Sequence, residues 1–157
     1  MPTPTDSTAC LIDTNILIYA VDASEVEKRN RSIEVLSRLI ASKRGILSIQ
    51  SVNEFFAATT RVRPGRPAIL TEQEAEHRCR TYLDSWACLN VIPAATAEAL
   101  RARRQYRMSY WDALLWATAR LNAIPTYLTE DLQHDQLIEG VRVLNPLRDD
   151  FDLSLLD

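Results

Sequence analysis

The sequence predicts an α/β domain with a mainly parallel central sheet. Short apolar runs of strand length alternate along the chain with longer segments whose apolar residues recur at helical spacing. Glycine occurs only three times in 157 residues, which disfavours a loop-rich β fold. Alternating strands and helices form parallel sheets covered by helices, so the loops that follow the strands share one edge.

The length is consistent with one domain that buries a sizeable core. We expect a flexible lead-in over residues 1–8, the folded domain over residues 9–147 and a C-terminal tail over residues 148–157. The acidic tail could pack on the surface, mask a groove or be disordered. No stretch approaches the ~18 apolar residues of a membrane span, and the N-terminus lacks a signal-peptide pattern. We therefore expect a cytoplasmic protein without membrane association.

The cysteines and histidines give no sign of redox or zinc chemistry. The three cysteines form no CxxC pair, and the two histidines are isolated, so we expect reduced thiols and no zinc site. The net charge is −3, but the basic residues are nearly all arginine, which suits bidentate phosphate contact. Two arginine clusters stand out: Arg61, Arg63 and Arg66, and then Arg101, Arg103, Arg104 and Arg107.

The first strand and the two helices after it follow from their apolar patterns. Residues 9–12 are an apolar run that ends at Asp13, and residues 15–21 are apolar nearly all round, which is typical of a short buried helix or turn. Asp22 opens a longer helix, and Gly45 is interpreted as its stop signal. The apolar residues that give this helix its period are Ile33, Leu36, Leu39 and Ile40.

Capping boxes mark the next helices. Residues 46–49 read as a second strand, and Ser51-Val-Asn-Glu54 has the form of a capping box that opens a helix to about residue 60. Proline and glycine make residues 61–70 a loop. A second capping box, Thr71-Glu-Gln-Glu74, opens a helix through about residue 86.

The remaining elements continue the alternation. Residues 89–92 read as a strand closed by Pro93, and a basic helix is expected over residues 96–108. Ser109-Tyr-Trp-Asp112 caps a further helix over residues 110–121. The last expected elements are a strand at 126–128, a short helix at 132–139 ended by Gly140, and a possible edge strand at 141–144.

Acidic residues gather where this topology ends its strands. Asp13 directly follows the first strand, Glu54 lies in the first helical turn after the second, and Asp131 lies just past the fourth. Asp112 can join them if its helix N-terminus points the same way. Clustered carboxylates repel one another unless cations compensate, and Mg²⁺ or Mn²⁺ prefers such oxygen ligands. This arrangement suits metal-assisted hydrolysis of a phosphodiester.

Each acid except Asp13 also has a purely structural interpretation. Glu54 and Asp112 are each the fourth residue of a capping box, where an acid stabilises the helix end unaided. Asp131 could be a turn residue. Asp13 is harder to explain in this way, because an acid that ends a buried strand is costly without a partner.

Four motifs in order give the chain a family resemblance. They are Leu11-Ile-Asp-Thr-Asn15, Ser51-Val-Asn-Glu54, Tyr110-Trp-Asp-Ala-Leu-Leu-Trp-Ala117 and Leu128-Thr-Glu-Asp-Leu132. They resemble the acidic motifs of the PIN-domain nucleases, and among these the VapC toxins of toxin–antitoxin pairs. The closing Gly140-Val-Arg-Val-Leu-Asn-Pro146 is also similar to the ending of such chains. The resemblance covers about residues 10–146.

This resemblance implies a Mg²⁺- or Mn²⁺-dependent endoribonuclease on a three-layer α/β/α sandwich. It implies that Asp13 and Asp112 are the principal metal ligands and that Glu54 and Asp131 complete the set of catalytic acids, either as further ligands or by orienting water. It also implies a homodimer and a cognate antitoxin. From their polarity and placement, we expect Asn15 and Thr129 to support the acids, and we expect Arg101, Arg103, Arg104 and Arg107 to bind RNA phosphates.

Two other functions compete with the nuclease. One is a catalytically inactive PIN-like module that binds a partner or RNA, although all four acids are present. The other is a phosphatase with Asp13 as nucleophile. It predicts a second aspartate two residues later, where this chain has Asn15, and a nearby lysine, but the chain has only Lys28 and Lys43.

Overall fold

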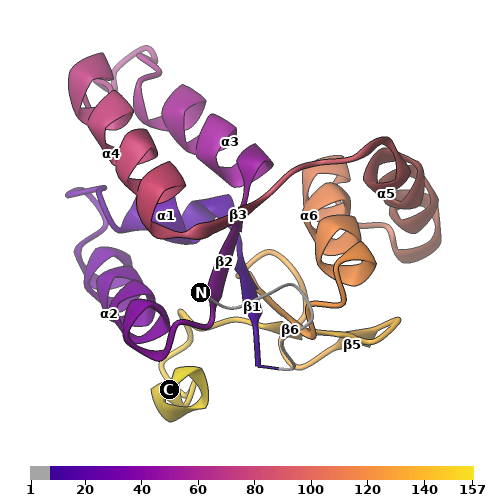
Figure 1. The fold of residues 1–157 in the computed structure, drawn as a ribbon. Helices are drawn as coiled ribbons and strands as arrows, with labels where there is room; N and C mark the ends of the chain where they lie inside the picture. Colours follow the sequence, from indigo (N-terminus) through magenta and orange to yellow (C-terminus); the bar gives the residue numbers. More distant parts are fainter. Residues whose placement is uncertain (1–7) are drawn as a thin grey trace.

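A computed structural model describes residues 8–157 and shows a six-stranded sheet between two layers of helices (Figure 1). The strand order is β3-β2-β1-β4-β6-β5, and every pairing is parallel except that of β5 with β6. The mainly parallel α/β/α prediction is confirmed. The lead-in predicted for residues 1–8 lies, except for residue 8, outside the described residues. The strands are β1 (Cys10–Ile12), β2 (Gly45–Ser48), β3 (Ala87–Leu89), β4 (Thr126–Leu128), β5 (Leu137–Ile138) and β6 (Val141–Leu144).

The two helical layers cover opposite faces of the sheet (Figure 1). One layer holds α1 (Thr14–Tyr19), α2 (Val26–Ser42), α3 (Ile49–Thr59) and α4 (Glu72–Ser85); the other holds α5 (Pro93–Tyr106) and α6 (Tyr110–Leu121). Alternate strand residues divide between two cores, since Leu11 packs with α5 and α6 whereas Ile12 packs with the other layer. Among residues 8–157, no helix combines the length and apolarity required to cross a membrane.

Helix α2 buries a different face from the one expected. Val35, Leu36 and Leu39 are buried, but Ile33 and Ile40 are exposed, so the prediction is wrong for these two isoleucines. Gly45 also differs from its predicted role, because Lys43 adopts the left-handed conformation that ends the helix. Gly45 instead opens β2, where a Cβ atom would lie 2.3 Å from Cζ3 of Trp86.

The N-cap of helix α3 lies three residues before the predicted one. Ser48 is its N-cap and accepts a 3.2 Å hydrogen bond from the amide of Gln50. The capping box predicted from Ser51 is therefore wrong. Ser51 lies inside the helix and donates to the carbonyl of Ile12, and Glu54 lies in the second turn. The capping box of Thr71 and Glu74 is confirmed at the start of α4.

Two other segments differ from their predicted secondary structure. Strand β3 ends at Leu89, and Pro93 starts α5 at a position where its missing N–H costs nothing. The helix predicted over residues 132–139 is wrong, since this segment turns and then forms β5. Positive φ angles at Asp135, Glu139 and Gly140 build these turns. Because β5 pairs with β6, β6 is not the edge strand.

The tail packs against α2 near the amino end of β2 (Figure 1). Phe151, Leu153 and Leu156 are buried in the core of that layer. Arg44, which immediately precedes β2, donates hydrogen bonds of 2.7 and 2.9 Å to the carbonyls of Leu155 and Asp157. The tail therefore covers the end of the sheet opposite to the carboxyl ends of the strands.

Candidate active site

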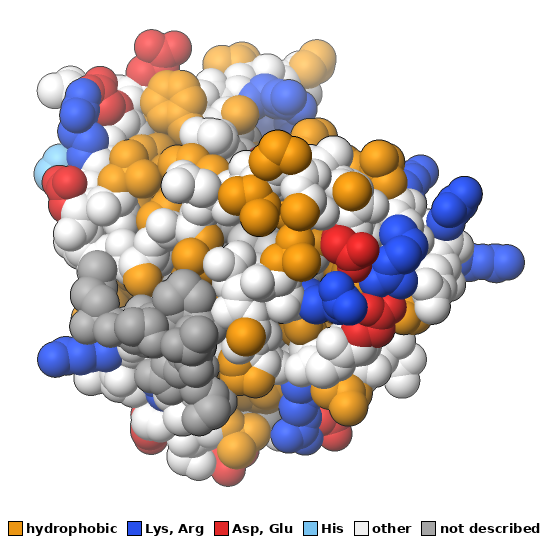
Figure 2. All heavy atoms as spheres, turned by 45° about the vertical axis from the view of Figure 1, so that its right-hand side comes forward, with side chains coloured by type: hydrophobic (Ala, Val, Ile, Leu, Met, Phe, Trp, Pro, Cys, Tyr) orange, Lys and Arg blue, Asp and Glu red, His pale blue; other side chains and the backbone are white. Residues whose placement is uncertain are grey.

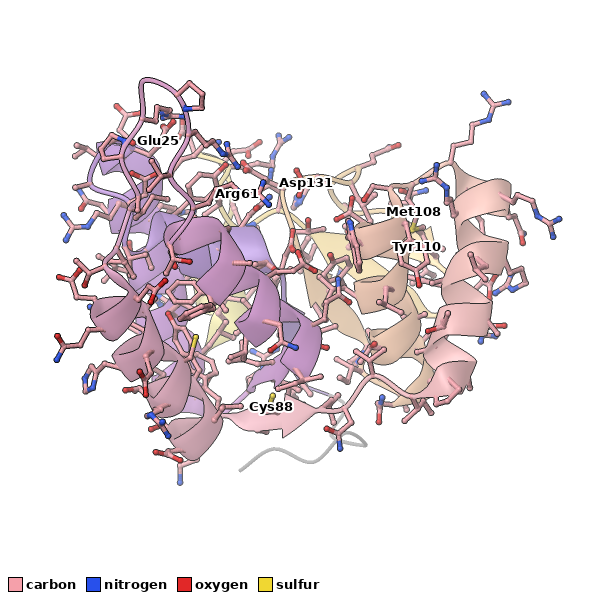
Figure 3. All side chains as sticks on the ribbon, turned by 90° about the horizontal axis from the view of Figure 1, so that it is seen from above. Glu25, Arg61, Cys88, Met108, Tyr110 and Asp131 are labelled. Atoms are coloured by element: carbon pink, nitrogen blue, oxygen red, sulfur yellow. The ribbon has the colours of Figure 1, made fainter. Side chains whose placement is uncertain are left out.

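Three aspartates from distant parts of the chain converge at the carboxyl edge of the sheet. Asp13 follows β1, Asp131 lies in the loop after β4, and Asp112 stands in the first turn of α6. One carboxylate oxygen of each lies within 4.8 Å of the other two. Figure 3 shows Asp131 at the opening between the helical layers, with Tyr110 on the α6 side. The acids line a pocket of about 350 Å³, together with Thr14, Asn15, Glu54, Ser109, Trp111 and Leu115.

Asp13 forms the floor of this pocket. Asp13 is only 4% exposed. Its amide donates a 3.0 Å hydrogen bond to the carbonyl of Leu128, which fixes the end of β1 against β4. Burial raises the pKa of Asp13 well above its usual range, while the hydrogen bond from Thr129 opposes the shift and the charge of Asp112 adds to it. An anion in this position therefore favours a nearby cation.

Two polar side chains hold the aspartates that follow β1 and β4. The hydroxyl of Thr129 donates a 2.7 Å hydrogen bond to Oδ2 of Asp13 and accepts one from the amide of Asp131. Asn15 donates a 2.8 Å hydrogen bond from Nδ2 to Oδ2 of Asp131. Each of these two residues thus orients an acid that lines the pocket.

Asp112 combines a capping contact with a place in the cluster. The hydroxyl of Ser109 accepts a hydrogen bond from the amide of Asp112 and donates one of 2.6 Å to its Oδ2. Its Oδ1 accepts no hydrogen bond from residues 8–157. Burial raises the pKa of Asp112, with Ser109 opposing the shift and the charge of Asp131 adding to it. Capping and pocket lining are therefore compatible.

Glu54 lines the wall of the pocket and is not one of the three closest acids. Gln50 donates a 2.6 Å hydrogen bond from Nε2 to Oε1 of Glu54, and the Thr14 hydroxyl approaches the other oxygen at 3.5 Å. Burial raises the pKa of Glu54, and the Gln50 contact opposes this. Sequence reasoning missed Gln50. Its position four residues before Glu54, on the same helix face, was the available signal.

Gln50 also connects the two helical layers. The same Nε2 donates a 3.1 Å hydrogen bond to the carbonyl of Trp111 at the start of α6. The Gln50 side chain therefore ties Glu54 on α3 to the start of α6, the helix that carries Asp112.

The donor set fits a hard divalent cation. The pocket offers carboxylate oxygens from Asp13, Asp112 and Asp131 at mutual distances that one ion can span. Among the residues that the structure describes, no lysine, arginine or histidine lines this pocket to balance the charge. Carboxylates gathered without such balance repel one another, and a bound cation relieves that repulsion.

The arginines predicted to bind RNA fall into two groups. Arg101 is engaged in ion pairs of 2.8 Å with Glu98 and Glu139. Arg103, Arg104 and Arg107 are exposed and have no carboxylate partner within residues 8–157. These three line a surface hollow with Met108 and Ser109, and Ser109 also lines the acidic pocket. Figure 2, which brings this side of the molecule forward, shows Lys and Arg side chains projecting into solvent.

The second arginine cluster lies on the other side of the opening. Arg61, Arg63 and Arg66 line a separate hollow of about 440 Å³. In Figure 3, Arg61 lies on the α3 side of the opening that also contains Asp131. Basic side chains therefore flank the acids from both helical layers.

Comparison with known proteins finds one matching family model and several solved structures with a similar fold. The PIN domain family model matches residues 10–139. No curated protein sequence matches the chain.

Solved structures agree with this fold. A toxin–antitoxin complex from Klebsiella pneumoniae shares 20% identity at a TM-score of 0.58, over 88% of this chain and 98% of that chain. VapC20 of Mycobacterium tuberculosis, described as a sarcin–ricin loop cleaving toxin, shares 18% identity at a TM-score of 0.59, over 85% and 99%. DNA-bound VapBC from Salmonella typhimurium shares 14% identity at a TM-score of 0.59, over 86% and 96%. At these identities the likeness shows the fold alone.

Proposed function

The chain belongs to the PIN domain family, and from this we propose that it is a metal-dependent endoribonuclease that hydrolyses RNA phosphodiesters. The observation that carries the proposal is the convergence of Asp13, Asp112 and Asp131, whose carboxylate oxygens lie within 4.8 Å of one another. Among the described residues, no lysine, arginine or histidine lines the pocket to balance their charge. A shared carboxylate cluster on an open pocket suits a charged substrate that approaches with metal ions.

Mg²⁺ or Mn²⁺ would be held by Asp13 and Asp112, with Asp131 beside them. When bound, such a cation supplies Lewis-acid chemistry, because it neutralises phosphodiester charge and acidifies water. Thr129 and Asn15 keep the carboxylates of Asp13 and Asp131 aimed into the pocket. Glu54, which Gln50 holds by a hydrogen bond, would accept a hydrogen bond from the water molecule that attacks the phosphorus.

Arg103, Arg104 and Arg107 would hold the phosphates that flank the cleaved bond. The hollow that they line adjoins the acidic pocket at Ser109, and no carboxylate in residues 8–157 forms an ion pair with them. Arg101 contributes less to this surface because Glu98 and Glu139 already occupy its guanidinium group. Binding through these arginines weakens as the salt concentration rises.

The biological role that fits best is the toxin of a toxin–antitoxin pair. Several structures with this fold are described as VapBC or toxin–antitoxin complexes. We include in the proposal a cognate antitoxin protein, a homodimer and a cytoplasmic location, where the RNA substrate is found. Co-expression with an adjacent small reading frame should relieve growth arrest if this role is correct.

The direct test is cleavage of structured RNA by purified protein. We expect cleavage with Mg²⁺ or Mn²⁺ and its loss with EDTA or with Asp13→Asn. Activity that survives both treatments would overturn the proposal. Calorimetry separates the remaining alternative, since no Mn²⁺ binding at millimolar metal would favour a non-catalytic PIN-like module.

A further inference from the structure

One large aromatic side chain lies unprotected beside the acids. Trp111 is 58% exposed and lines the acidic pocket next to Asp112, whereas the other two tryptophans, Trp86 and Trp116, are 8% and 0% exposed. Leaving an indole in water forfeits the stabilisation that its burial provides. The exposed position of Trp111 at the mouth of the site is therefore a feature that the fold itself does not require.

Neighbouring groups fix the position of Trp111 without burying it. Its carbonyl accepts the 3.1 Å hydrogen bond from Gln50, and it lies in the first turn of α6, which Ser109 caps. Its ring meets the ring of Tyr110 edge to face, with centroids 5.1 Å apart and an interplanar angle of 71°. A side chain held in this way can receive a planar ligand with little loss of conformational freedom.

We propose that Trp111 stacks on an unpaired base of the RNA, next to the phosphate that lies at the acids. The inference rests on the proposed function and adds a substrate feature to the same site. Single-stranded nucleic acids are typically bound by a basic surface that follows the phosphates and an aromatic side chain that stacks on a base. Here Ser109 joins the hollow of Arg103, Arg104 and Arg107 to the pocket that Trp111 lines.

A protein segment is the competing occupant of this surface. The nucleobase is favoured because the exposed indole lines the acidic pocket, which shares Ser109 with the arginine hollow, and both features suit a polyanion with its counter-ion. One is the set of arginines without carboxylate partners in residues 8–157, and the other is a carboxylate cluster that fits a divalent cation. Stacking also selects RNA whose base is unpaired at the cleavage point, such as a loop.

Tryptophan fluorescence tests the contact directly. Because Trp86 and Trp116 are buried, acrylamide-accessible emission comes mainly from Trp111. The probes are a short single-stranded oligoadenylate RNA and an abasic chain of the same length, each in Ca²⁺, with binding followed by anisotropy and intact RNA verified on a gel. We expect the oligoadenylate to protect Trp111 from acrylamide and the abasic chain to bind without protecting it. Bound oligoadenylate that leaves the quenching unchanged would overturn the proposal.

Substitutions provide a second, independent measurement. Trp111→Ala and Trp111→Leu should weaken RNA binding or raise KM about tenfold or more, whereas Trp111→Phe retains most of the affinity. Mn²⁺ affinity should be unchanged in all three. Leu137→Ala, which alters an exposed apolar residue on β5, is the matched control and should bind RNA normally.

The outcomes separate this inference from the proposed function. If the protein cleaves RNA with metal but Trp111→Ala and Trp111→Phe have equal KM values, stacking is wrong and the nuclease stands. If metal-dependent cleavage is absent but oligoadenylate still protects Trp111, the nuclease is wrong and stacking stands. If Trp111→Ala binds RNA normally but loses binding to the co-expressed antitoxin, the surface docks protein and the inference is overturned.

Discussion

The hydroxyl of Thr129 links two of the acids that meet in the pocket. It donates a 2.7 Å hydrogen bond to the buried Oδ2 of Asp13 and accepts a 3.1 Å hydrogen bond from the amide of Asp131. The side chain of one residue therefore ties the carboxylate of Asp13 to the backbone of the loop that carries Asp131.

Removing this hydroxyl should weaken metal binding without unfolding the protein. Partners that orient metal ligands typically account for about tenfold to a hundredfold in metal affinity. We expect Thr129→Val to lower Mn²⁺ affinity by that factor in calorimetry, while Thr129→Ser keeps most of it. Equal Mn²⁺ affinity in wild type and Thr129→Val would show that the hydroxyl does not orient Asp13 for metal.

The capping role of Asp112 can be separated from its role in the acidic pocket. The capping bond to Ser109 uses the amide of Asp112, so Asp112→Asn keeps it while it removes repulsion from Asp131. We expect Asp112→Asn to abolish cleavage and to unfold in urea at or above the wild-type midpoint. Ser109→Ala should instead cost about 1 kcal/mol of stability. An Asp112→Asn protein that cleaves RNA but unfolds early would identify Asp112 as a cap alone.

Charge reversal at the exposed arginines beside the acidic pocket should weaken RNA binding and leave metal binding unchanged. Arg103→Glu and Arg107→Glu should weaken RNA binding, and each lost phosphate contact should reduce the slope of log affinity against log salt by about 1. Mn²⁺ affinity should be unchanged. The control is Arg80→Glu, an exposed arginine on α4. A similar loss in the control would indicate a general charge effect.

Gly45 should tolerate no side chain. A Cβ at this position would lie 2.3 Å from Cζ3 of Trp86, so Gly45→Ala forces the indole or the strand to shift. We expect a loss of about 1–3 kcal/mol in urea unfolding. The double variant Gly45→Ala, Trp86→Leu should lose less than the sum of the two single variants. Strict additivity would exclude a clash between the two residues.

Acid should remove a stabilising contact at Glu139. Arg101 and then Tyr106 lower the pKa of Glu139 to about 2. This pKa lies below that of an unfolded glutamate, about 4.3, so the stabilisation is present above that pH and is lost as the pH falls toward 2. Urea midpoints of wild type and Glu139→Gln should therefore converge over this range. A gap between the two proteins that stays constant with pH would contradict the assignment.

The sequence was sufficient to place the acids that directly follow strands. Asp13 follows β1 and Asp131 follows β4, and parallel pairing of Ile12 with Leu128 brings the ends of these strands together. Asp112 could not be placed in this way, because its position depends on how α5 packs on α6. That packing is set by buried small residues such as Ala99 and Ala113, whose long-range partners a local pattern does not identify.

The errors also have local physical causes. Ser51 and Glu54 have the spacing of a capping box, but Ser48 stands at the true helix start, and that leaves the Glu54 carboxylate available to the pocket. Arg101 has Glu98 nearby in sequence, but Glu139, 38 residues later, also holds its guanidinium. Only the folded chain distinguishes this paired arginine from those at positions 103, 104 and 107, which have no carboxylate partner in residues 8–157.

The strand order has a consequence for self-association. The described sheet ends on one side at β3, which has 3 residues, and on the other at β5, which has 2. Such short edges present few unpaired backbone groups on which another chain could add a strand. The fold therefore presents little edge for β-aggregation at either margin, while the apolar inner strands β1, β2, β4 and β6 remain enclosed between the helices.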